Sequence, residues 1–104
     1  MGLFGIFSQK KETNDVKEYL TKGAVILDVR TLEEWDEAHG KKAKHIVLTT
    51  VPLRLEEIRS WDKPIIAVCR SGARSSQATQ FLVSNGLDAI NGGPWQNVDQ
   101  YVVE

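Results

Sequence analysis

The sequence predicts an α/β domain in which helices cover both faces of a central, mostly parallel β-sheet. Continuous apolar runs at residues 24–27 and 65–68 are typical of strands that are buried on both faces. Helical patterns alternate with the apolar runs at short intervals, as they do in α/β folds. Because the chain shows no internal repeat or low-complexity tract, we expect a single layered core.

The length of 104 residues suits one domain that folds without disulfides or a structural metal. We expect this domain to span residues 13–104 and residues 1–12 to be an N-terminal tail. The tail begins with an apolar stretch, residues 1–7, that is too short to span a membrane and lacks the features of a signal peptide. The alternative to a frayed tail is a segment that binds a partner or touches a membrane.

The first elements follow from helix-start signals and an apolar run. Residues 13–20 begin with capping residues and place their apolar side chains on one face, which predicts a short helix. The first strand is the run at 24–27. Thr31 and Glu34 have the spacing of a capping box, in which each side chain bonds the backbone N–H of the other residue, and they predict a helix that reaches Ala38.

The middle of the chain predicts a strand, a helix and a second strand. Residues 46–48 are apolar and predict a short strand. Pro52 suits the first turn of a helix, which we expect to continue to Trp61 before Asp62-Lys63-Pro64 ends it. The expected apolar face of this helix consists of Leu53, Leu55, Ile58 and Trp61. The run at 65–68 is the strongest strand signal in the chain.

The last elements are a helix, a strand and a C-terminal helix. Residues 75–85 have the pattern of an amphipathic helix, and Gly86 stands where its C-cap belongs. Residues 87–90 predict the final strand. Gly92-Gly93-Pro94 then predicts a turn into a C-terminal segment that we expect to be helical.

Composition narrows the classes of function. Lys and Arg number 13 against 14 Asp and Glu, so no overall charge selects nucleic acid or an anionic membrane as a partner. The single cysteine excludes a disulfide within the chain and favours a reducing compartment, for which we expect the cytoplasm. Neither His39 nor His45 stands in a cluster with the spacing of metal ligands, so we expect no metal site.

The loop after the 65–68 strand is the candidate site, because ligands of parallel sheets bind beyond the carboxyl ends of the strands. This loop reads Cys69-Arg70-Ser71-Gly72-Ala73-Arg74-Ser75 and leads into a helix. Its small residues allow successive backbone N–H groups to point inward at the helix N-terminus, where they favour an anion. The amides and the two arginines predict a lowered pKa for Cys69 and therefore a nucleophilic thiolate. A small core residue is the alternative reading of a lone cysteine.

The same loop resembles the active-site loop of single-domain rhodaneses. The segment Leu27–Thr31, followed by Glu33-Glu34-Trp35, resembles the family's Asp-Val-Arg segment and the helix after it. Asn91-Gly92-Gly93 and Trp95 resemble its closing Gly-Gly and Trp. The similarity covers roughly residues 17–101. It departs from the family at residues 39–52, where the usual Pro-Gly turn is missing and Pro52 comes several residues late. Three separated motifs in the right order make the resemblance specific.

The resemblance implies a rhodanese-like fold and a sulfurtransferase that needs no cofactor. Cys69 would attack the sulfane sulfur of thiosulfate or another persulfide donor, hold the sulfur as a persulfide, and pass it to a thiol, to cyanide or to a protein acceptor. Arg70 would bind the anionic donor. The substrate-binding residues would be Arg70, Ser71, Gly72, Ala73, Arg74 and Ser75, whose amides hold the persulfide. Arg74 would either bind substrate or brace the loop.

Two other functions are consistent with the loop. A rhodanese-fold binding or regulatory module is one, although such copies commonly lack the cysteine. A cysteine-dependent phosphatase or arsenate reductase is the other, but phosphatase loops place five residues between Cys and Arg, whereas four separate Cys69 from Arg74. Outside the loop, Asp28 and Arg30 are expected to be structural, as an ion pair or a hydrogen-bonding bridge near the end of the first strand.

Overall fold

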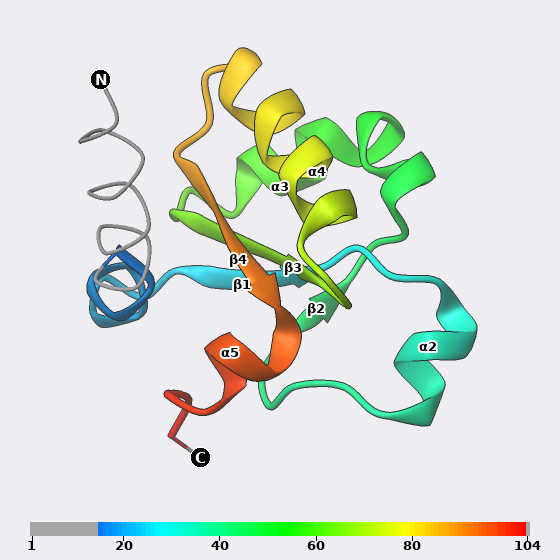
Figure 1. Ribbon diagram of the computed structural model, residues 1–104. Coiled ribbons are helices and arrows are strands. Elements are labelled where there is room, and N and C mark those ends of the chain that lie inside the picture. The colour runs from blue at the N-terminus through cyan, green and yellow to red at the C-terminus, as the bar shows by residue number, and fades with distance from the viewer. Residues whose placement is uncertain (1–14, 104) are drawn as a thin grey trace, which may run out of the picture.

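A four-stranded parallel sheet forms the centre of the protein. The computed structural model describes residues 15–103, so the predicted tail and the predicted start of the first helix at Thr13 lie outside the described residues. The strands are β1 (Val25–Asp28), β2 (Lys44–His45), β3 (Ile65–Cys69) and β4 (Ala89–Pro94). Their order in the sheet is β2-β1-β3-β4, with every pair parallel (Figure 1). The predicted α/β class with a parallel sheet is confirmed.

Helices cover both faces of this sheet, as predicted. The α-helices are α2 (Leu32–Glu37), α3 (Leu55–Ser60), α4 (Ala73–Ser84) and α5 (Trp95–Asp99), and residues 15–21 are helical as well. Two 3₁₀ helices, η1 (Leu48–Thr50) and η2 (Pro52–Arg54), precede α3. Helices α3 and α4 pack on one face, and α5 and the helix at 15–21 pack on the other (Figure 1). No helix within residues 15–103 is long and apolar enough to cross a membrane.

The side chains of β3 alternate between the two layers of the core. Ile65, Ala67 and Cys69 pack in the layer that contains residues of α3 and α4. Ile66 and Val68 pack in the opposite layer, with residues of α5 and of the helix at 15–21. All five residues are buried, as expected of a central strand that is covered on both faces. The alternation directs the side chain of Cys69 toward the α4 side of the sheet.

The helix α2 begins as the capping box predicts. Thr31 is its N-cap, and its hydroxyl accepts a hydrogen bond from the Glu34 N–H at 3.2 Å. In return, the Thr31 N–H donates to Glu34 Oε1 at 3.1 Å. The helix has no buried residue and lies beside the carboxyl edge of the sheet rather than over a face (Figure 1). The capping box therefore fixes the Glu34 carboxylate at the edge where the candidate loop lies.

The strand predicted at 46–48 is displaced in the structure. β2 is formed by the two preceding residues, and Lys44 pairs with Leu27 of β1. Ile46 still donates to the Asp28 carbonyl at 3.1 Å, but its side chain is buried in the core and the chain then enters η1. The apolar residues mark a segment that turns inward to the core, while the paired edge strand is polar.

The helix predicted from Pro52 to Trp61 is interrupted, and its expected apolar face is wrong at one position. Pro52–Arg54 forms η2, and the α-helix begins only at Leu55. A 3₁₀ helix has about three residues per turn, so it changes the direction in which successive side chains point. Leu53 is consequently 84% exposed, whereas Ile58 is buried as predicted.

β4 runs through residues that predict a turn. Its register with β3 pairs Ala67 with Asn91 but Val68 with Gly93, so Gly92 is an extra residue in the strand. A Cβ at Gly92 would lie 2.6 Å from methyl groups of both Ile66 and Val98. The glycine thus allows a β-bulge against the core, and Pro94 is tolerated because β4 is an edge strand.

Candidate active site

The loop between β3 and α4 is tighter than the sequence predicts. α4 begins at Ala73, two residues before the expected start at Ser75, and Gly72 is its N-cap. Gly72 has φ 103°, a backbone conformation that favours glycine over residues with a Cβ. This conformation directs the Gly72 N–H back toward Cys69 Sγ, to which it donates at 3.0 Å.

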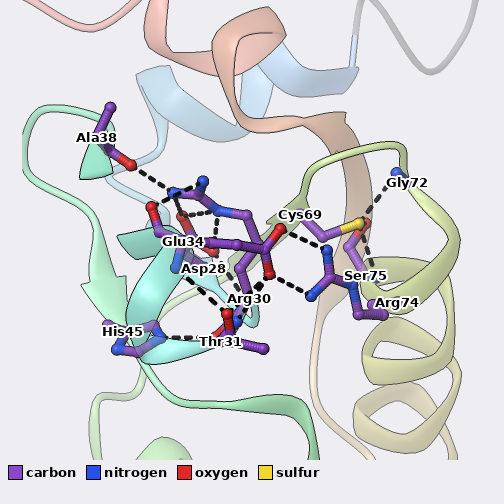
Figure 2. A network of polar contacts seen from close by, with 10 residues as sticks. All are labelled: Asp28, Arg30, Thr31, Glu34, Ala38, His45, Cys69, Gly72, Arg74 and Ser75. Atoms are coloured by element: carbon purple, nitrogen blue, oxygen red, sulfur yellow. Dashed lines mark hydrogen bonds and ion pairs between the residues drawn. The ribbon is translucent and has the colours of Figure 1, made fainter. Parts of the chain in front are cut away.

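The sulfur of Cys69 is surrounded by donors from the first turn of α4 (Figure 2). Besides Gly72, the Ser75 N–H donates to Sγ at 3.4 Å, and Ser75 Oγ lies 3.3 Å from it. Ser75 and Cys69 are both fully buried. Of the other four residues of the loop, Arg70, Ser71 and Ala73 are exposed and Arg74 is partly buried. The arrangement is a nest of donors that suits a sulfur-centred anion.

Two opposing effects act on the ionisation of Cys69. Burial raises the pKa of the thiol, because a thiolate in the core loses its hydration. Hydrogen bonds from Ser75 and from backbone amides of the loop lower it, because they stabilise the thiolate. The hydrogen bonds together outweigh burial, and the pKa of Cys69 lies below its ordinary value. The hydrogen bonds therefore stabilise the thiolate form of Cys69 in place of water.

The two arginines of the loop have different surroundings. Arg74 donates from Nη1 to Glu34 Oε1 at 2.7 Å and from Nη2 to Glu34 Oε2 at 3.0 Å. Hydrogen bonding to Arg74 is the main cause that lowers the pKa of Glu34 to about 2. Since Glu34 also caps α2, this carboxylate connects α2 to α4. Of the two roles considered for Arg74, the contacts support bracing the loop, and Arg70 remains the exposed arginine.

The predicted ion pair between Asp28 and Arg30 is confirmed. Arg30 Nη2 lies 2.8 Å from Asp28 Oδ2, and the two side chains are 6% and 0% exposed. The same nitrogen donates to the Ala38 carbonyl at 2.8 Å, at the end of α2 (Figure 2). The guanidinium also lies over the Trp95 ring, 5.3 Å from its centroid. Arg30 therefore connects β1, the end of α2 and the start of α5.

Asn91 is part of the site although the sequence motif gave it no role. Its Oδ1 accepts from Ser75 Oγ at 2.6 Å and from the Gly93 N–H at 3.0 Å. Its Nδ2 donates to the Gly72 carbonyl at 3.1 Å. A usable signal was its position directly after the last predicted strand, residues 87–90, because parallel strands end at one edge of the sheet. The pairing of Arg74 with Glu34 was also missed, since 40 residues separate the two in sequence.

A cavity of about 190 Å³ adjoins the exposed arginine of the loop. Its lining includes Arg30, Glu37, Arg70, Trp95 and Gln96, so it lies between α2 and the start of α5. A larger cavity of about 590 Å³ lies between the helix at 15–21 and the C-terminal residues, and no residue of the loop lines it. The smaller cavity is therefore the one in which a ligand would meet Arg70.

Comparisons with known proteins point to one family. The family model of the rhodanese-like domain matches residues 12–94 of this chain. The thiosulfate sulfurtransferase GlpE of Haemophilus influenzae is 32% identical over 73 residues, which are 70% of this chain and 69% of that protein. A rhodanese-like domain protein from Staphylococcus aureus superposes with a TM-score of 0.65 at 30% identity, covering 88% of this chain and 92% of that one. An NAD-dependent persulfide reductase from A. fulgidus gives a TM-score of 0.56 at 37% identity, over 73% of this chain and 14% of that one.

Proposed function

Because this chain belongs to the rhodanese-like domain family, we propose that it is a sulfurtransferase in which Cys69 carries a sulfane sulfur as a persulfide. Sulfur transfer is supported at the level of the family by the similarity to the thiosulfate sulfurtransferase GlpE. The donor, the intermediate and the residue roles are inferred from the site. The observation that carries the proposal is the nest of donors around Cys69 Sγ, at 3.0 to 3.4 Å.

In the first half-reaction, the Cys69 thiolate attacks the sulfane sulfur of thiosulfate. A bond forms between Sγ and that sulfur, the sulfur–sulfur bond of thiosulfate breaks, and sulfite leaves with the electron pair. Arg70 binds the negative charge of the donor, because it is the exposed arginine beside the small cavity. Arg74 stays paired with Glu34 and keeps α4 in place.

In the second half-reaction, a thiol or cyanide attacks the outer sulfur of the persulfide. The bond between the two sulfurs breaks, and Cys69 leaves as a thiolate. The donors of Gly72 and Ser75 stabilise this leaving group as they stabilise the nucleophile in the first step. Both half-reactions proceed without a cofactor.

Two features support sulfur transfer over phosphate chemistry. Four residues separate Cys69 from Arg74, and the resulting small ring of amides suits one sulfur atom better than a tetrahedral phosphate. In addition, both terminal nitrogens of Arg74 contact Glu34, and an arginine engaged in this way is not free to bind a phosphate with both nitrogens.

We also propose that the protein is cytoplasmic, because a free thiol at Cys69 stays reduced in that compartment.

The persulfide is tested by intact mass spectrometry. We expect the reduced protein to gain the mass of one sulfur atom on incubation with thiosulfate and to lose it again on addition of cyanide or a thiol. Cys69→Ser should show neither the gain nor turnover, because a serine hydroxyl stays protonated at neutral pH and attacks sulfur poorly.

The control in this experiment is hydrolysis of an aryl phosphate, which should be negligible in both proteins. If the wild-type protein gains no sulfur from thiosulfate or from glutathione persulfide, the carrier mechanism is wrong and a rhodanese-fold binding module takes its place. Efficient phosphatase turnover that disappears in Cys69→Ser would instead reassign the chemistry.

A further inference from the structure

The hydroxyl of Ser75 lies between two acceptors. Ser75 Oγ is 2.6 Å from Asn91 Oδ1 and 3.3 Å from Cys69 Sγ. A serine hydroxyl has one proton to donate and lone pairs with which to accept. It can therefore donate fully to one of these two acceptors but not to both. Because Ser75 is fully buried, water does not supply a substitute donor.

The contacts of Asn91 determine which end of its amide faces Ser75. The Gly93 N–H is a donor, so the Asn91 amide atom 3.0 Å from it is the acceptor Oδ1. The Gly72 carbonyl is an acceptor, so the Asn91 amide atom 3.1 Å from it is the donor Nδ2. A flipped amide would place donor against donor at Gly93 and acceptor against acceptor at Gly72. The atom beside the Ser75 hydroxyl is thus an oxygen, and the short contact requires Ser75 to donate to it.

We propose that Asn91 is a positioning residue that competes with the Cys69 sulfur for the single hydroxyl proton of Ser75. While the thiol is protonated, Ser75 donates to Asn91 and its lone pair accepts from the S–H of Cys69. When the thiolate forms, the hydroxyl rotates toward the sulfur and gives up its bond to Asn91. The catalytic meaning of this competition rests on the proposed sulfur transfer. In the persulfide, Sγ carries no charge and the proton returns to Asn91.

The charged side chains near Cys69 on α4 and β1 are mostly paired with opposite charges, so the sharing of the Ser75 proton is the contact that can change when Cys69 ionises. On its own loop and helix, the sulfur is accompanied by Arg70 and Arg74, and Arg74 is neutralised by Glu34 of α2. From β1, the buried Asp28 is paired with Arg30. β4, whose sequence is AINGGP, contributes no charge. β4 contacts the hydroxyl of Ser75 through the uncharged side-chain amide of Asn91.

The competition predicts that removing a polar side chain next to the site lowers the pKa of Cys69 instead of raising it. Loss of the competing oxygen in Asn91→Ala frees Ser75 to donate to the thiolate, so the pKa of Cys69 should fall by roughly half a pH unit to one pH unit. Ser75→Ala removes the donor and should raise the pKa. In the Ser75→Ala background, Asn91→Ala should leave the pKa unchanged, because no proton remains to be shared.

The measurement is the thiolate absorbance in the ultraviolet as a function of pH, with Cys69→Ser as the baseline. This readout works with a buried thiol, since no reagent has to reach it. Gln77→Ala is the matched control, because it removes an exposed side-chain amide from α4. Asn91→Leu, which is nearly isosteric and also lacks an acceptor, repeats the test should Asn91→Ala unfold.

A role in loop shape alone would give a different result. If removal of the Asn91 amide only displaced the Gly72 N–H, the pKa of Cys69 would rise, and it would rise in both Ser75 backgrounds. Either a rise or an equal shift in the two backgrounds overturns the inference. The proposed function is judged separately by the gain of sulfur mass, so absence of sulfur transfer with the expected pKa cycle would reject the function and keep the proton competition.

Discussion

One carboxylate, that of Glu34, holds both the first turn of α2 and the guanidinium of Arg74. Hydrogen bonding to Arg74, together with contacts to Thr31, lowers the pKa of Glu34 from 4.5 to about 2. A carboxyl whose pKa is lowered on folding stabilises the protein above its unfolded pKa, and this contribution is lost as the pH falls to the folded value. The pH window of the effect is therefore about 4.5 down to about 2.

Glu34→Gln should reduce the free energy of unfolding by about 1 kcal/mol at neutral pH, a modest value because the ion pair is partly exposed. The difference from the wild-type protein should shrink as the pH is lowered through this window. Urea unfolding at a series of pH values measures it. Glu57→Gln, at the more exposed pair with Arg54, is the control and should have a smaller effect. A difference that persists at the acid end would contradict the ionic origin.

At this scale the sequence predicts residues better than it predicts their partners. Cys69 and the residues of its loop are adjacent in the chain, so a local motif is enough to identify them. The partner of Arg74 is 40 residues away and the partner of Ser75 is 16 residues away. Those contacts exist only once α2 and β4 dock against the loop, and local patterns carry no information about docking.

The bulge in β4 makes the packing of this strand against α5 sensitive to one atom. Gly92→Ala should destabilise the protein by about 1–3 kcal/mol, because the added Cβ overlaps methyl groups of Ile66 and Val98 and forces them apart. Removing one of those methyl groups relieves part of the overlap. The double variant Gly92→Ala, Val98→Ala should therefore be more stable than the sum of the two single changes predicts.

Urea unfolding of the two single variants and the double variant measures this coupling. The matched comparison is Gly92→Ala combined with Ile58→Val, which lies in the other layer of the core and should be additive. Simple additivity for the Val98 pair would show that the bulge accommodates a side chain by moving the strand instead.

Elements were predicted most accurately where a specific local contact defines their ends. The capping box of Thr31 and Glu34 predicts the start of α2 because both hydrogen bonds lie within three residues of each other. The strand predicted at 46–48 was displaced because an apolar run indicates burial but not strand pairing. The helix predicted from Pro52 was interrupted because its apolar spacing does not distinguish a 3₁₀ turn from an α-helix. β4 continues through two glycines because its bulge depends on neighbours in the sheet and in α5.

In the whole molecule, the buried pair of Asp28 and Arg30 links the sheet to α2. Arg30→Met should lower the free energy of unfolding by about 3–5 kcal/mol, because it leaves Asp28 buried without a partner. This is a large share of the roughly 5–15 kcal/mol that stabilises a typical domain. Equilibrium urea unfolding gives the value directly.

Arg54→Met is the matched control, since it removes the same charge from an exposed pair in which both side chains are more than 40% accessible. Its effect should be small. Equal effects of the two substitutions would mean that the interior pair contributes no more than a surface pair.

The layered arrangement of the whole molecule could be predicted from the alternation of helices and strands. The contacts of Arg30 with Ala38 and Trp95 could not, because they form only in the folded chain.

Under the proposed function, the complete burial of the Cys69 side chain would affect the two half-reactions differently. Loading requires a donor to reach Sγ itself, beneath the loop, which favours small, slender anions over bulky disulfides or oxidants. Unloading requires an acceptor to reach only the outer sulfur, which is one bond farther from the backbone. Sγ would therefore stay buried while the outer sulfur is transferred. Under the proposed function, the protein would be more selective for its sulfur donor than for its sulfur acceptor.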